Sequence, residues 1–392
     1  MGDSRKYSKR AFSHIQYLVE QIGPRPAGSI NEQRAIEYVK NQLKGTGYAI
    51  ETQPVLFAPH PRIDFLYLAF GFVLLFGSIY FEKIPLAAVF LPVLFLLLPT
   101  ISQFVNDHSK TNSRSSNVLV TGCGNQKKPS FLLCAHVDSA RSITFKSEFL
   151  IFLYAKTAFF IQRVAYFVSL IAILLLIGLE LPEWMIFITK FVGGIAGLWL
   201  ILVEVINQIP KPRYSKGAHD NASGVGVLLA LAEWSKEQNF QNIQVEFLFT
   251  GAEETGLHGA KSYILNRIPS SLPHYALNID MVGGGDKLYY VFRDGLIFQR
   301  DTSARLNSVL KIVIPGIMPY WNTLRSGDYL PFLKAGIHAT SIQTGGCHRI
   351  DLIYHTELDQ LNRIDGNTIH QVVTGVQNWL MFWENNLVDS QR

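Results

Sequence analysis

Two long apolar blocks interrupt this 392-residue chain, and they restrict its fold more than any other feature. A helix that crosses a lipid bilayer needs about 20 apolar residues, with roughly 17 as a lower limit. Each block contains two such apolar runs, at 65–81 and 84–105 in the first block and at 164–179 and 184–203 in the second. We therefore expect two helical hairpins, hence about four transmembrane helices, with a lipid bilayer as partner.

A hairpin buried in a soluble core is the alternative interpretation, but the runs have no polar face, and this favours lipid. The segment 149–161 is expected to lie in the membrane interface. Gly193 and Gly197 have the spacing that lets membrane helices pack closely. Three ionisable residues lie near the ends of apolar runs, and we expect them to snorkel rather than to form a transport path: Lys156, Lys190 and Glu204.

Outside the two blocks, short apolar runs alternate with helical patterns. The runs 131–135, 245–250 and 275–279 are bounded by turn residues and predict buried strands. Strands that alternate with helices predict an α/β fold, with a mixed, mainly parallel sheet sandwiched by helices. Ligands of such sheets gather outside the carboxyl ends of the strands.

Charge and cysteine content exclude several classes of function. The net charge is +5, and the basic residues do not cluster as a nucleic-acid partner would require. The three cysteines, Cys123, Cys134 and Cys347, have neither the spacing of a zinc finger nor that of a disulfide framework. The polar stretch 1–10 predicts no cleavable signal peptide.

Residues that bind metals recur directly after the predicted strands. His136 and Asp138 follow the first of these strands and lie on the same side of an extended chain. In the simplest arrangement His136 binds a metal while Asp138 accepts the other ring N–H. Asp220 precedes a helix, where a lone aspartate is usually only a cap. Its interpretation therefore depends on the other residues of the set.

Further carboxylates follow the other strands. Glu253 and Glu254 are adjacent, and two such carboxylates repel each other unless a cation lies nearby. Because adjacent side chains point in different directions, one can bind metal while the other faces water. Asp280 ends a strand, and His355 completes the set. Two histidines with several carboxylates suit zinc, and a bridging carboxylate could hold two ions about 3.5–4 Å apart. The pattern predicts a co-catalytic hydrolase.

Six ordered motifs resemble the di-zinc aminopeptidases of metallopeptidase family 28, relatives of the bacterial leucyl aminopeptidases and of the glutaminyl cyclases. The motifs are Ile-Gly-Pro-Arg-Pro-Ala-Gly-Ser29, Ala-His136-Val-Asp138-Ser, Asp220-Asn-Ala-Ser-Gly-Val, Gly-Ala-Glu253-Glu254-Thr-Gly, Asn-Ile-Asp280-Met-Val and Tyr-His355-Thr-Glu-Leu-Asp. Apart from the apolar blocks, the resemblance covers nearly the whole chain.

The resemblance implies a role for each of these residues and two zinc ions as cofactors. Asp220 would bridge the ions, and the peptide bond after it is often cis in the family. His136 and Asp280 would complete one site, and Glu254 and His355 the other. Glu253 would be the general base, and Asp138 would orient His136. The sequence departs from the family at His219, where an acidic residue is common, and in the long gap that contains the second apolar block.

The expected organisation is a catalytic domain in three parts with two inserted hairpins. The parts are 1–60, 107–146 and 211–392, and the transmembrane hairpins are 61–106 and 147–210. Two hairpins return the chain to the side it left. The basic residues that flank the spans on that side predict a cytoplasmic catalytic domain: Arg62, Lys110, Arg114, Lys146, Lys211 and Arg213.

The resulting prediction is a membrane-anchored zinc aminopeptidase. Asp138 and Asp220 flank the second hairpin, so we expect an active site close to the bilayer and peptide substrates with hydrophobic ends. A glutaminyl cyclase is the alternative enzyme, and the intact His136 and the Glu-Glu-Thr-Gly motif argue against it. A receptor or scaffold with an inactive peptidase fold is the other alternative. None of the family's ligands is missing here, which argues against it.

Overall fold

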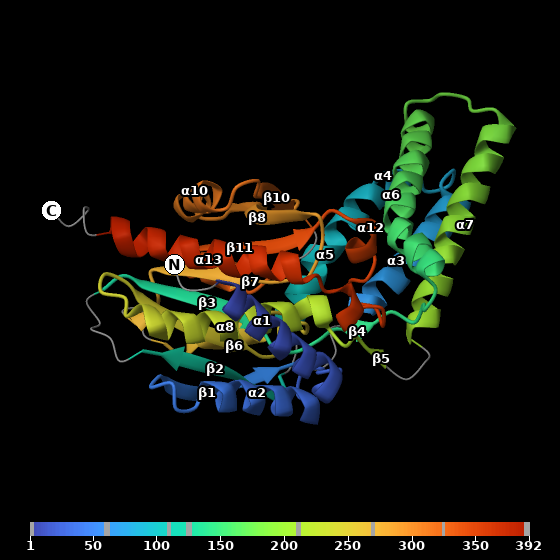
Figure 1. Cartoon of the computed structure of the whole chain (residues 1–392). Helices are drawn as coiled ribbons and strands as arrows, with labels where there is room; N and C mark the ends of the chain where they lie inside the picture. The colour runs from blue at the N-terminus through green and yellow to red at the C-terminus, as the bar shows by residue number, and fades with distance from the viewer. Residues whose placement is uncertain are drawn as a thin grey trace. The chain divides into compact units, whose positions relative to one another are not determined.

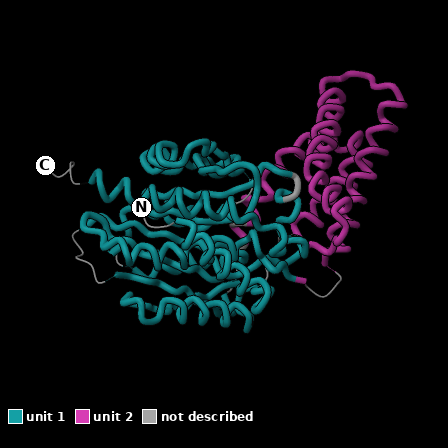
Figure 2. The backbone as a smooth tube through the Cα atoms, in the orientation of Figure 1, with its two compact units in different colours: residues 1–59, 110–142, 214–392 teal, residues 60–109, 143–213 magenta. Residues whose placement is uncertain are grey.

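The computed structural model describes residues 4–58, 63–107, 111–122, 128–208, 213–267, 271–323 and 326–387. The chain divides into two compact units (Figure 2). The sheet unit comprises Met1–Pro59, Lys110–Ser142 and Tyr214–Arg392, and the helical unit comprises His60–Ser109 and Ile143–Arg213.

A nine-stranded mixed sheet forms the centre of the sheet unit (Figure 1). Along the sheet lie β1 (Ala49–Phe57), β2 (Ser113–Thr121), β6 (Gln244–Thr250), β3 (Ser130–His136), β7 (Tyr275–Ile279), β11 (His338–Gly345), β8 (Lys287–Asp294) and β10 (Met318–Asn322), while β9 (Arg300–Asp301) pairs with β8. The central strands β6, β3, β7 and β11 are parallel, as are β8 and β10; the other pairings are antiparallel. The short strands β4 (Arg141–Ser142) and β5 (Arg213–Tyr214) form a separate two-stranded sheet.

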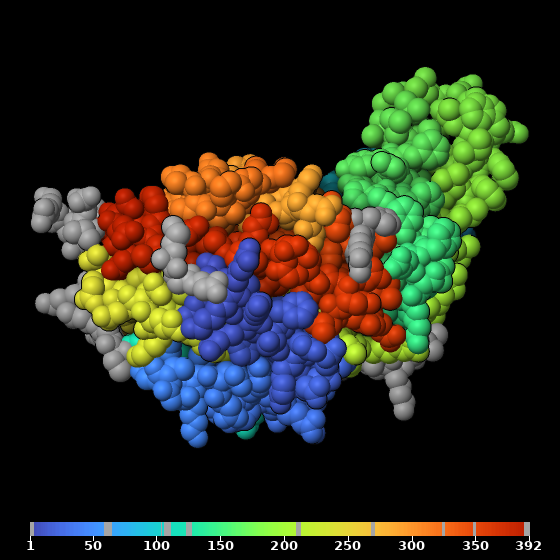
Figure 3. Space-filling model, in the orientation of Figure 1, coloured from blue at the N-terminus to red at the C-terminus, as the bar shows by residue number. Residues whose placement is uncertain are grey.

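Helices cover both faces of this sheet, because side chains alternate along each buried strand. Phe131 and Leu133 of β3 join one apolar cluster, and Leu132 and Cys134 join another. The first cluster includes α1 (Ser4–Gln16), η1 (Tyr17–Ile22), α2 (Ile30–Leu43), α8 (Ser223–Gln238), α10 (Ala304–Val313) and α13 (Gly366–Asn386). The second includes α9 (His258–Leu265) and α11 (Tyr329–Lys334). In the space-filling view α1, in dark blue, lies beside α13, in red (Figure 3). The predicted mixed α/β fold is confirmed.

Short helical turns lie within the loops of the sheet unit. They are η2 (Ala218–Ala222), α12 (His348–Asp351) and η4 (Leu361–Arg363). Of these, η2 directly precedes α8, so the Asp220 predicted from the sequence lies in the turn that leads into a buried helix.

In its described residues the helical unit has five helices around an apolar cluster of its own. They are α3 (Ile63–Tyr80), α4 (Pro85–Val89), α5 (Leu91–Asp107), α6 (Glu148–Leu176) and α7 (Glu183–Gln208). By length and composition α6 and α7 are able to cross a membrane, whereas the apolar helices Phe65–Tyr80 and Leu91–Ser102 are shorter. Residues 149–161, predicted as an interfacial segment, are continuous with the apolar run after them in the single helix α6. Gly193 and Gly197 do let helices approach closely, since a Cβ on Gly197 would lie 2.6 Å from the backbone nitrogen of Leu75.

Candidate metal centre

The sequence-predicted residues meet at one edge of the sheet. His136 is the last residue of β3, Asp280 follows β7, and the Glu253–Glu254 pair lies in the loop after β6. Because β6, β3 and β7 are parallel, their carboxyl ends lie together. Loops after α12 and before α8 supply the remaining residues.

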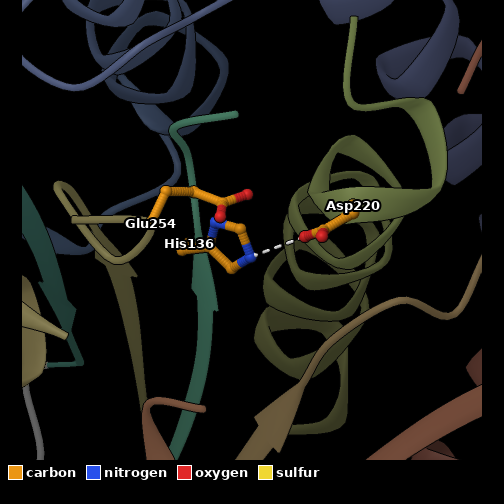
Figure 4. Close-up of side chains that lie close together, drawn as sticks. All are labelled: His136, Asp220 and Glu254. Atoms are coloured by element: carbon orange, nitrogen blue, oxygen red, sulfur yellow. Dashed lines mark ion pairs between the residues drawn. The ribbon is translucent and has the colours of Figure 1, made fainter. Parts of the chain in front are cut away.

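The carboxylate of Asp220 lies between two histidines. Its Oδ1 is 3.1 Å from Nε2 of His136, and its Oδ2 is 3.4 Å from Nε2 of His355. Each histidine faces a second carboxylate as well: Nε2 of His136 is 3.5 Å from Oδ1 of Asp280, and Nε2 of His355 is 3.0 Å from Oε2 of Glu254. Figure 4 shows His136, Glu254 and Asp220 converging. The structure thus gathers all five sequence-predicted ligands into two sets that share Asp220.

These side chains fit metal ions better than they fit one another. Oε1 of Glu254, Oδ1 of Asp280 and Nε2 of His355 are buried without a hydrogen-bond partner. A tetrahedral zinc ion with ligands about 2.0–2.2 Å away separates neighbouring ligand atoms by about 3.3–3.5 Å. The contacts of 3.0–3.5 Å around Asp220 are close to that spacing. Ligand atoms of His136, Asp220 and Glu254 also lie within 4.8 Å of one another.

The pKa values of the buried carboxyl groups also indicate a site for cations. Burial raises the pKa of Glu253 well above its ordinary value, and the carboxylates of Glu254 and Asp328 add to the effect. Burial and the negative charge of Asp220 raise the pKa of Glu254 to about 7. Burial opposes protonation of His355, but Glu254 and Asp220 raise its pKa to about 9. Such a cluster of buried carboxylates retains protons unless cations replace them.

Asp138 holds the loop that carries the two glutamates. Its Oδ1 and Oδ2 accept the backbone N–H groups of Glu253 and Glu254, each at 3.1 Å. Nδ1 of His136 lies 3.2 Å from the carbonyl oxygen of Asp138 and 3.5 Å from its carboxylate. The carboxylate of Asp138 therefore lies near the His136 ring, which it was predicted to orient, but it binds the glutamate loop more closely than it approaches the ring.

Two buried residues that sequence reasoning did not single out also support the site. The carboxylate of Asp359 accepts the backbone N–H groups of His219 (2.7 Å) and Asp220 (3.0 Å). Asp359 ends the motif that contains His355, which was the only sequence signal for it. Arg25 is fully buried and donates to backbone carbonyl oxygens on both sides of the site.

The backbone at Asp220 matches an expectation from the resemblance, since the Asp220–Asn221 peptide bond is cis. The neighbouring His219 is also buried, and its Nδ1 accepts the backbone N–H of Gly283 at 3.2 Å. Burial lowers the pKa of His219 to about 4, so the ring remains neutral at physiological pH.

Comparisons with known proteins agree with this geometry. Residues 204–380 match the model of the family described as "Peptidase family M28". Aminopeptidase YwaD of Bacillus subtilis (strain 168) is 29% identical over 178 residues, which are 43% of this chain and 38% of that protein. Leupeptin-inactivating enzyme 1 of Streptomyces exfoliatus is 26% identical over 174 residues, or 39% of this chain and 38% of that protein. The matched stretch thus spans well under half of these relatives.

Solved structures share the fold. A zinc aminopeptidase from Bacillus subtilis superposes with a TM-score of 0.57 at 15% identity, covering 96% of this chain and 95% of that one. A glutaminyl cyclase from Porphyromonas gingivalis superposes with a TM-score of 0.54 at 15% identity, covering 96% of this chain and 98% of that one. Both likenesses establish the fold alone, and they confirm the zinc-exopeptidase-like architecture predicted from the sequence.

Proposed function

Because residues 204–380 match the model of peptidase family M28, we propose that the chain is a membrane-anchored di-zinc aminopeptidase. The observation that carries the proposal is the carboxylate of Asp220, whose two oxygens face two separate histidine–carboxylate pairs. His136 and Asp280 would hold one zinc ion, Glu254 and His355 the other, and Asp220 both.

The chemistry required is the hydrolysis of an N-terminal peptide bond. Two zinc ions, when bound, supply a water of lowered pKa and polarise the scissile carbonyl. Glu253 is the general base, which takes the proton from that water and returns it to the leaving amine. Asp138 supports this role, because its carboxylate accepts the backbone N–H groups of Glu253 and Glu254 and so fixes the loop from which both side chains extend.

A glutaminyl cyclase is the second candidate, because such enzymes share the fold with a similar TM-score. The two-sided arrangement around Asp220 favours the peptidase, since a cyclase of this family typically uses one zinc. A non-catalytic scaffold is the third candidate, and the convergence of all five predicted ligands argues against it.

The helical unit is proposed to anchor the enzyme in a lipid bilayer, with the catalytic domain on the cytoplasmic side and peptides with hydrophobic ends as substrates. Support comes from α6 and α7, which have the length and apolar composition of membrane spans. Of the basic residues used to predict the orientation, Arg62, Lys110 and Lys211 lie outside the described residues. Digestion of the sheet unit by protease added only from the extracytoplasmic side of sealed vesicles would contradict this orientation.

Metal analysis combined with a substrate panel tests the catalytic proposal. The full chain, purified in detergent, should carry two zinc ions and hydrolyse aminoacyl arylamides, and a chelator should abolish the activity. Glu253→Gln should keep the zinc and lose the hydrolysis, while the exposed control Glu51→Gln should behave like the unmodified chain. Cyclisation of glutaminyl peptides without arylamide hydrolysis would favour the cyclase. Zinc binding without either reaction would favour the scaffold.

A further inference from the structure

The loop that carries the two glutamates is held by side chains at four consecutive backbone N–H groups. Residues 251–254 form this loop, and Asn117, Glu32 and Asp138 are here termed the amide cradle. The acceptors are Oδ1 of Asn117 for Gly251 (3.1 Å), Oε1 of Glu32 for Ala252 (3.2 Å), and Oδ1 and Oδ2 of Asp138 for Glu253 and Glu254 (3.1 Å each). Three distant segments therefore determine the path of one short loop.

Within this loop Ala252 has an unfavourable backbone conformation. Its φ of +55° lies in the left-handed region, where a Cβ crowds the following carbonyl oxygen. Glu253 and Glu254 follow immediately, so the directions of both side chains depend on Ala252 keeping this conformation. A residue other than glycine remains there only when surrounding contacts hold it.

Glu32 supplies the contact at Ala252 itself. It is fully buried at the start of α2, where Ser29 caps the helix. Its Oε1 also accepts from the hydroxyl of Ser115 at 2.7 Å, and its Oε2 accepts from the N–H of Gly28 at 2.6 Å. Both oxygens therefore face backbone N–H donors. An amide in place of the carboxylate would turn its NH₂ group toward one of them, whichever way it is oriented.

We propose that Glu32 is a positioning residue that holds Ala252 in its left-handed conformation and thereby directs Glu253 and Glu254 into the metal centre. Glu32 touches neither substrate nor metal and acts through the loop. The proposal deepens the proposed peptidase function and rests on it for the catalytic measurement, but not for the measurement of zinc affinity.

The test compares Glu32→Gln with the double variant Glu32→Gln/Ala252→Gly in the full-length chain. We expect Glu32→Gln to lower kcat about tenfold or more with KM changed less than about threefold, because the substrate-binding surface remains. Zinc affinity, measured by competition with a chromogenic chelator, should fall by about tenfold, since Glu254 is one of the ligands. Glycine adopts the left-handed conformation without a Cβ, so the added Ala252→Gly should recover several-fold of both losses.

Ser115→Ala is the matched control, because it removes another hydrogen bond to the same oxygen of Glu32 but none of the bonds accepted from the N–H groups of the loop. Its kcat and zinc affinity should stay within about twofold of the unmodified chain. Glu32→Asp, which keeps the carboxyl group but withdraws it by one methylene, replaces Glu32→Gln if that variant does not fold, with the same expected losses and recovery.

Two results would overturn the proposal. In the first, Glu32→Gln and Ser115→Ala lose kcat and zinc affinity to the same extent, and these losses are proportional to the fall in Tm of each variant. In the second, the double variant has no higher kcat and no higher zinc affinity than Glu32→Gln. If the unmodified chain binds zinc but hydrolyses no arylamide, the peptidase function fails, and the zinc affinities of the same variants still decide the role of Glu32.

Discussion

Replacing Arg25 with lysine is expected to destabilise the sheet unit and to weaken zinc binding together. The guanidinium of Arg25 is fully buried and donates to backbone carbonyl oxygens of three separate segments. The acceptors are Leu18 (3.3 Å), Gly23 (2.9 Å), Val137 (2.9 Å), Lys216 (2.9 Å) and Gly217 (3.0 Å). Val137 lies between His136 and Asp138, and Gly217 precedes Asp220 by three residues. Arg25 therefore joins the two sides of the metal centre.

The size of the effect follows from the number of donors. A lysine ammonium has three protons on one atom, so at least two of the five hydrogen bonds would be lost. The carbonyl oxygens of Leu18 and Gly217 would still accept backbone N–H groups, so the loss is counted in bonds to a charged donor. Such a bond contributes about 1.5–3 kcal/mol, which gives a loss of about 3–6 kcal/mol for two. Burial lowers the pKa of Arg25 to about 10, so the guanidinium is still charged at neutral pH. A buried lysine is more readily deprotonated, which adds to the loss.

Thermal unfolding of the detergent-purified chain measures this loss. For a unit of this size, 3 kcal/mol corresponds to a fall in Tm of about 5 °C. Zinc affinity should decrease by about tenfold, because the segments that carry His136 and Asp220 would lose bonds that Arg25 makes to both of them. Arg34→Lys, at an exposed position of α2, is the control and should leave both quantities unchanged. An Arg25→Lys variant with the Tm and zinc affinity of the unmodified chain would refute the reasoning.

Three further outcomes are expected. Glu253→Gln should lower kcat by about 10²–10⁴-fold at unchanged zinc content, and a residual rate within tenfold of the unmodified chain would contradict its role as base. Asp359→Asn should weaken zinc binding by about tenfold in chelator competition, since an amide cannot accept both N–H groups of the Asp220 turn; equal affinity would remove that role. Gly197→Ala should destabilise the helical unit by about 1–3 kcal/mol, measured as a lower Tm, because its Cβ would lie 2.6 Å from the backbone nitrogen of Leu75. Gly194→Ala is the matched control, since its Cβ would meet only Leu75 Cδ1 at 4.0 Å. Equal Tm values for the two variants would contradict the packing argument.

The sequence predicted the parts of the site that follow from local rules. His136 and Asp280 were found because they end apolar runs, and parallel strands bring their carboxyl ends to one edge. Arg25 and Asp359 were not found, because their partners are backbone groups of segments far away in the chain. A backbone carbonyl or N–H carries no signal of residue type, so only the tertiary structure reveals which side chain binds it.

Glu32 is an intermediate case. The pattern Ser29-x-x-Glu32 is that of a capping box, and the Glu32 N–H donates to Ser29 as the pattern predicts, while the Glu32 side chain reaches back to the N–H of Gly28, one residue before the N-cap. A local rule thus explains one oxygen of Glu32. The other oxygen binds Ala252, 220 residues later, and that contact depends on how α2 packs against the sheet.

The helical unit shows the same limit for charged residues. Lys190 was expected to snorkel, but its ammonium forms an ion pair with Glu82, in the turn between α3 and α4. Lys190 lies seven residues after Glu183, the first residue of α7, which is about 10 Å along the helix axis. The turn after α3 therefore contacts α7 about two helical turns after the first residue of α7. This agrees with the lengths of the two helices, since α3 has 18 residues and α7 has 26. Of the about four transmembrane helices expected from the sequence, α6 and α7 have the length and composition of membrane spans among the described helices, whereas the apolar stretches Phe65–Tyr80 and Leu91–Ser102 are shorter. The ion pair is therefore a contact between the two hairpins of the helical unit.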